Sequence, residues 1–138
     1  MALPHAPEAR HYYQAARQRL NDALFLMGGE RTTGAIYLAG YAVECMLKAL
    51  ILSMTAGAKR RAALEAFRGS KAHDYNWLKA RYFKSGGQPF PPNIAKSFSL
   101  VNTWTVEIRY RAGSSKRADA EVFLKNVDSI MLWADGRM

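Results

Sequence analysis

The segment from Ala35 to Met54 constrains the fold of this chain most, because it is almost continuously apolar and yet contains charged residues. Its apolar side chains recur at three- and four-residue spacings, which predicts a helix from about Thr33 to Thr55. A helix that is apolar nearly all round is normally buried inside a folded protein. Gly40, Glu44 and Lys48 interrupt the apolar run, so we do not expect the helix to cross a membrane.

Glycines and prolines divide the rest of the chain into further segments with helical spacing. We predict helices over Glu8–Met27, Ala62–Phe67, Tyr75–Lys84, Asn93–Ile108 and Arg117–Ala134. Runs of alternating β-branched residues are absent from the sequence, so no strands are expected. The sequence therefore predicts an all-α protein: an antiparallel up-and-down four-helix bundle with a short extra helix, forming one domain over residues 1–138 with its core at about 8–135.

Local signals mark several helix ends. Pro92 suits the first turn of a helix, and Asp74 is a good N-cap residue. Gly28 and Gly29 are expected to end the first helix through the left-handed backbone that glycine allows. Gly40 costs about 1 kcal/mol relative to alanine inside a helix, so we expect a packing reason for it.

The charge balance points to acidic partners. The formal net charge is +9, from 20 Lys and Arg against 11 Asp and Glu, which favours nucleic acid, nucleotides or an acidic protein. The single cysteine, Cys45, excludes an internal disulfide and is typical of a reducing compartment. Because no secretory signal is visible either, we expect a cytoplasmic protein that does not bind membranes. The usual phosphate-loop and metal-binding motifs are missing from the sequence, so we expect no metal and no cofactor.

Glu44 is the most informative single residue, since a carboxylate in such an apolar helix needs a partner. Lys48 follows four residues later, the favourable spacing for an ion pair within a helix, and Tyr41 lies three residues before it. Two interpretations remain open. Glu44 and Lys48 occupy an exposed seam, or Glu44 points into the bundle and meets a cation, which we expect to be an arginine.

Two other segments carry groups that suit phosphate chemistry. Arg109, Tyr110 and Arg111 stand together after a predicted helix, and arginine binds phosphate with two donors and stacks on bases. The alternative is a solvated helix end, where a cation complements the helix dipole. His73 can carry a proton or contact a phosphate. Beside it, Asp74 is explained by helix capping alone.

Four segments of the chain, taken in order, resemble one family. They are Tyr13-x-x-Ala16-x-x-Arg19-Leu20, the stretch from Gly34 to Ile51 with Glu44 and Leu47-Lys48-Ala49-Leu50, His73-Asp-Tyr-Asn-Trp-Leu78, and Glu107-Ile-Arg109-Tyr110. This series resembles the HEPN family of small helical bundles (higher eukaryotes and prokaryotes nucleotide-binding) over nearly the whole chain.

The resemblance implies a bundle that forms a homodimer and acts on nucleotides or RNA, often beside a small nucleotidyltransferase in a toxin–antitoxin pair. Many members are metal-independent ribonucleases with an Arg-x(4-6)-His motif. Here no histidine follows Arg109 or Arg111, which indicates a binding module rather than an enzyme. We expect the site to comprise Tyr41, Glu44, Lys48, His73, Asp74, Arg109, Tyr110 and Arg111.

Two alternatives come from different classes of protein. The first is a metal-independent ribonuclease toxin that uses Arg109 and His73, with arginine stabilising charge and histidine moving a proton. The second is a protein-interaction module in which Glu44 and Arg109 form an internal ion pair that fixes helix register.

Overall fold

The computed structural model describes residues 3–110, 112, 113 and 115–138, with Arg109 described by its backbone alone. The described residues form helices and connecting segments, without a strand among them, which confirms the all-α class. The α-helices are α1 (Pro7–Gly28), α2 (Thr32–Ser53), α3 (Gly57–Ala66), α4 (Tyr75–Lys84), α5 (Pro92–Val101) and α6 (Arg117–Asp135). Two short 3-10 helices are η1 (Ser70–His73) and η2 (Val106–Tyr110).

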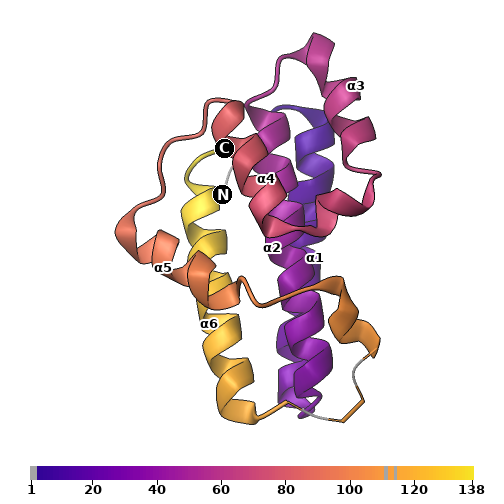
Figure 1. Cartoon of the computed structure of the whole chain (residues 1–138), viewed down its shortest axis with the longest axis vertical. Helices are drawn as coiled ribbons and strands as arrows, with labels where there is room; N and C mark the ends of the chain where they lie inside the picture. The colour runs from indigo at the N-terminus through magenta and orange to yellow at the C-terminus, as the bar shows by residue number, and fades with distance from the viewer. Residues whose placement is uncertain (1–2, 111, 114) are drawn as a thin grey trace.

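The long helices α1, α2 and α6 extend along the length of the molecule (Figure 1). Helices α1 and α2 pack side by side and run in opposite directions, while α6 packs on α2. The Thr32 hydroxyl donates to the carbonyl of Ser115 at 2.7 Å, so α2 and α6 begin at the same end of the molecule. Helix α3 lies at the other end, and α5 packs against α6.

Helix α2 forms the centre of the core, as its apolar sequence predicts. The segment Thr32–Met54 is long and apolar enough to cross a membrane by length and composition, but 72% of its most apolar window is buried inside the protein. Such burial is typical of a helix in the core of a folded protein.

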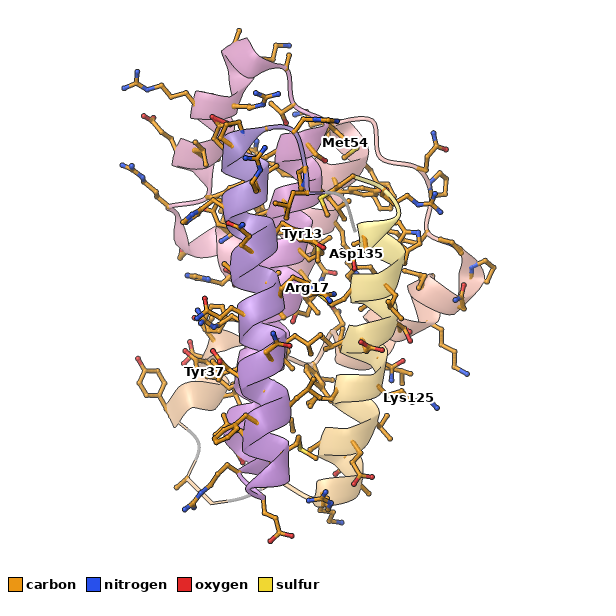
Figure 2. The ribbon with its side chains drawn as sticks, turned by 180° about the vertical axis from the view of Figure 1, so that it is seen from behind. Tyr13, Arg17, Tyr37, Met54, Lys125 and Asp135 are labelled. Atoms are coloured by element: carbon orange, nitrogen blue, oxygen red, sulfur yellow. The ribbon has the colours of Figure 1, made fainter. Side chains whose placement is uncertain are left out.

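A polar contact joins α1 to the end of α6. Arg17 Nη1 lies 3.2 Å from Asp135 Oδ2, and the Asp135 side chain is almost completely buried. Figure 2 shows Tyr13 and Arg17 on α1 beside Asp135. Burial, and then a hydrogen bond with Asp135, raise the pKa of Tyr13. This contact secures the last turn of α6 against α1.

Most predicted helix positions are confirmed, including α4 over Tyr75–Lys84. Asp74 caps α4, because its Oδ1 accepts the backbone N–H groups of Asn76 at 2.7 Å and Trp77 at 3.4 Å. Pro92 occupies the first turn of α5, as expected. The short helix α3 begins earlier than predicted, at Gly57, and so includes the basic residues 59–61.

The predicted left-handed glycine after α1 is wrong. Gly29 has a φ of −92°, and the positive φ of 60° belongs to Glu30. The N–H of Arg31 donates back to the carbonyl of Leu26 at 2.8 Å, a six-to-one bond that requires the residue before Arg31 to be left-handed. The left-handed residue of this turn is therefore Glu30, one residue after the glycine pair.

The predicted helix over Asn93–Ile108 is wrong beyond Val101, where α5 ends. The chain then crosses in front of α2 and turns into η2 on the far side (Figure 1). Asn102 and Thr103 are weak helix formers, and Trp104 gains a docking position on α2 that a straight helix does not provide.

Candidate functional site

Trp104 anchors the segment after α5 to the middle of α2. A Cβ atom at Gly40 would overlap the Trp104 indole, so glycine is required for this approach, as the sequence led us to expect. The indole Nε1–H donates to the carbonyl of Tyr37 at 3.2 Å. The Tyr75 ring stacks on the indole with centroids 5.4 Å apart, and its hydroxyl donates to the carbonyl of Gly40 at 2.7 Å. These contacts bring α2, α4 and the segment before η2 together.

Glu44 lies one helical turn further along α2 and is buried with two partners. Lys48 Nζ donates to Glu44 Oε2 at 2.8 Å, and His73 Nδ1 lies 2.9 Å from Glu44 Oε1. Each carboxylate oxygen therefore faces one nitrogen. Lys48 comes from the same helix, whereas His73 ends η1, 29 residues later in the chain.

Lys48 is enclosed as fully as Glu44. Its ammonium lies 5.6 Å from the ring centres of both Tyr12 and Phe67, and its side chain is only 6% exposed. The exposed-seam interpretation of Glu44 and Lys48 is therefore wrong. Among the described side chains, the Lys48 ammonium and the His73 imidazole contact Glu44, where the sequence led us to expect an arginine.

His73 is the part of this cluster that reaches the surface, with a side chain that is 40% exposed. The Tyr41 ring meets the imidazole edge to face at 6.2 Å between centroids. When Nδ1–H donates to Glu44, the neutral imidazole keeps a lone pair on Nε2. The buried pair thus fixes the orientation of a partly exposed histidine, with Nδ1 held on the carboxylate.

A pocket of about 440 Å³ opens beside His73. Three parts of the chain line it: Ser70 and residues 73–76 around η1 and the start of α4, then Asn102, Trp104 and Thr105, and the start of η2. Its polar side chains include Asn76, Asn102 and Thr105, and its carboxylates are Asp74 and Glu107. Trp104 and Tyr75 form the apolar wall between the pocket and α2.

The structure brings together five of the eight residues proposed from the sequence: Tyr41, Glu44, Lys48, His73 and Asp74. Because Glu44 and Lys48 are buried, a ligand in the pocket meets His73 rather than either of them. Tyr110 ends η2 and is 71% exposed. The Arg109 side chain and the whole of Arg111 lie outside the described residues, so the expected contribution of both arginines stays a prediction.

Sequence reasoning missed Trp104 and the polar residues around it. The one signal that pointed to Trp104 was Gly40, a helix-interior glycine that needed a packing partner. Asn102 and Thr105 carry no comparable signal, since exposed polar residues in a presumed helix are ordinary. Glu107 stood in the segment Glu107-Ile-Arg109-Tyr110 that resembles the family, but not among the proposed site residues.

Burial and the charge of Glu44 also raise the pKa values of two neighbouring side chains, Cys45 and Tyr75. Burial, and then the Glu44 charge, raise the pKa of the Cys45 thiol to about 11. The same two causes raise the pKa of Tyr75 well above its usual value. Both groups are therefore held neutral at physiological pH. Within the part of the chain that the structure describes, no three His, Cys, Asp or Glu side chains gather to hold a metal ion.

Comparisons with known proteins place this fold. The crystal structure of TT1696 from Thermus thermophilus matches with a TM-score of 0.69 and 20% identity, over 96% of this chain and 100% of that chain. At this identity the likeness shows a shared fold. A search of curated proteins finds no significant match. The model of the HEPN domain matches residues 9–137, nearly the whole chain, and the chain therefore belongs to the HEPN domain family.

Proposed function

We propose that this HEPN domain binds a nucleotide or RNA at the pocket beside His73. The observation that carries the proposal is the buried Glu44–Lys48 pair, which holds a partly exposed histidine in the lining of a pocket that also contains polar side chains. An imidazole held in this way, with the lone pair of Nε2 left over, suits accepting a hydrogen bond from a base edge or a sugar hydroxyl. The net charge of +9 favours approach of a polyanion.

The proposal includes the arginines next to η2. Arg109, Tyr110 and Arg111 follow pocket-lining Glu107 in the chain after Ile108, so we propose that they meet phosphates outside the pocket. The absence of a histidine after Arg109 favours binding without cleavage.

For the wider assembly we propose a cytoplasmic homodimer whose partner is a small nucleotidyltransferase in a toxin–antitoxin system. Within each copy, the helices would form an antiparallel up-and-down four-helix bundle with a short extra helix. Light scattering tests the dimer: twice the chain mass of 15.5 kDa is expected, and a monomer mass at micromolar concentration would contradict it.

The binding site is tested by titrating a fluorescent single-stranded RNA. His73→Ala is expected to weaken affinity about two- to tenfold, the scale of one hydrogen bond between neutral groups. His5→Ala removes an exposed histidine that does not line the pocket and is expected to change nothing. Arg109→Ala should weaken binding and lower the salt slope by about one. Unchanged affinity in both His73→Ala and Arg109→Ala would place the site elsewhere.

One observation favours a second function, a metal-independent ribonuclease. A histidine oriented by a carboxylate is the usual form of a general base, and His73 has this arrangement with Glu44 at 2.9 Å. This reading predicts RNA cleavage in excess chelator that is lost in His73→Ala. Intact RNA after long incubation with pure protein would exclude it.

A further inference from the structure

The pocket beside His73 is rich in hydrogen-bond acceptors. Its two carboxylates are Asp74 and Glu107, and the His73 ring presents the lone pair of Nε2 when Nδ1 donates to Glu44. Asn76 and Asn102 add amides, and Ser70 and Thr105 add hydroxyls, all of which accept as well as donate hydrogen bonds. Lys and Arg are absent from the described residues that line this pocket. Such a wall is complementary to a ligand that donates hydrogen bonds.

The acceptor groups in the pocket suit the sugar of a nucleotide better than its phosphates. A phosphate inside the pocket would lie between two carboxylates, and their negative charges would repel it. A ribose offers hydroxyl donors instead, and carboxylates bind ribose hydroxyls in other nucleotide sites. The phosphates then remain outside, where Arg68 and Lys71 flank the pocket-lining residue Ser70 in sequence.

Glu107 is the group best placed to recognise the sugar. It is exposed in the first turn of η2 and forms no hydrogen bond or ion pair with another described side chain. Asp74, in contrast, already uses Oδ1 to cap α4. The carboxylate of Glu107 is therefore available at the pocket wall at little structural cost.

We propose that Glu107 accepts a hydrogen bond from the 2′-hydroxyl of a ribonucleotide in this pocket, so that the site selects RNA over DNA. The inference rests on the proposed function. The 2′-hydroxyl is the group by which a protein distinguishes the two nucleic acids at a given position.

The experiment compares three fluorescent single strands of one unstructured sequence: RNA, DNA and fully 2′-O-methylated RNA. Binding is measured by anisotropy at constant salt with the full chain, Glu107→Ala and Glu65→Ala. Glu65 lies exposed on α3 outside the pocket, so both variants remove one negative charge. The general electrostatic gain from that removal is therefore the same in both.

The unaltered chain is expected to bind RNA about tenfold or more tightly than DNA or methylated RNA, since a hydrogen bond to a charged group has that value. Glu107→Ala should bring the RNA-to-DNA ratio close to one, while Glu65→Ala keeps it. Equal binding of the three strands by the unaltered chain would overturn the inference and leave the proposed function standing. An equal loss of affinity for RNA and for DNA in Glu107→Ala would also overturn the inference, because it would mean that the carboxylate contacts the base rather than the sugar. Binding of none of the strands would overturn both proposals.

Discussion

Replacing Glu44 by methionine tests whether the Glu44–Lys48 pair is a coupled buried unit. The two side chains are 3% and 6% exposed, so Glu44→Met leaves an ammonium buried without its carboxylate. Removing one partner of a buried ion pair typically costs about 3–5 kcal/mol. The Tyr12 and Phe67 rings still face Lys48 at 5.6 Å and offset part of that loss. We therefore expect a value near the lower end, about 3 kcal/mol.

The assay is urea unfolding followed by circular dichroism. With a slope of about 2 kcal/mol per molar urea, a loss of 3 kcal/mol lowers the midpoint by about 1.5 M. Lys48→Met is expected to cost less than Glu44→Met, because His73 still faces the remaining carboxylate at 2.9 Å. The double variant removes both charges and should be more stable than Glu44→Met alone. If the two single losses simply add in the double variant, or if each is below about 1 kcal/mol, the reasoning about this pair is refuted.

Three further predictions concern neighbouring parts of the molecule. Gly40→Ala should destabilise the protein by about 1–3 kcal/mol in the same assay, because the new methyl group overlaps Trp104. Gly34→Ala is the control: its methyl group meets only a movable leucine methyl, so the change should be neutral or stabilising. Equal effects of the two substitutions on stability would contradict the docking of Trp104 on Gly40. Cys45 of the folded protein should react with iodoacetamide at pH 8 about 200-fold more slowly than Cys45 of the protein unfolded in urea. A pKa near 11 leaves about one thiol in a thousand as thiolate, against about one in four for an ordinary thiol. Comparable rates would show that the folded protein does not hold the thiol neutral. The pKa of Tyr75 is higher in the folded state than in the unfolded state. Its contribution to stability is therefore complete below about pH 10 and is lost as the pH rises above that value. Urea midpoints that stay level from pH 9 to 11.5 would contradict this prediction.

The sequence predicts the helices well where their ends are encoded locally. Asp74 supplies a side-chain cap and Pro92 a preset first turn, and both helices begin where these residues indicate. The end of α5 is different, because the apolar spacing of Phe98, Val101 and Trp104 continues as if the helix did. What ends it is the tertiary contact of Trp104 with Gly40, two residues that are far apart in the chain. Periodicity cannot register such a contact.

The site follows the same division. Glu44 and Lys48 are detectable from sequence because charges stand out in an apolar helix, and their i,i+4 spacing is local. His73 was noticed as a separate feature, but its contact with Glu44 spans 29 residues and depends on how η1 lies against α2. The pocket itself depends on the course of residues 102–107, which turn away where a helix was predicted. Its lining was therefore beyond the reach of sequence pattern.

The buried pair has a further consequence for function. Two apolar residues of similar volume in place of Glu44 and Lys48 would give a core at least as stable, since desolvation of the charges offsets much of their attraction. Stability alone therefore does not account for a carboxylate at this position. What apolar residues cannot do is hold the imidazole of His73 with one nitrogen bound and the other directed away. The pair is best understood as a device that fixes His73 at the pocket, with Lys48 neutralising the carboxylate that does so.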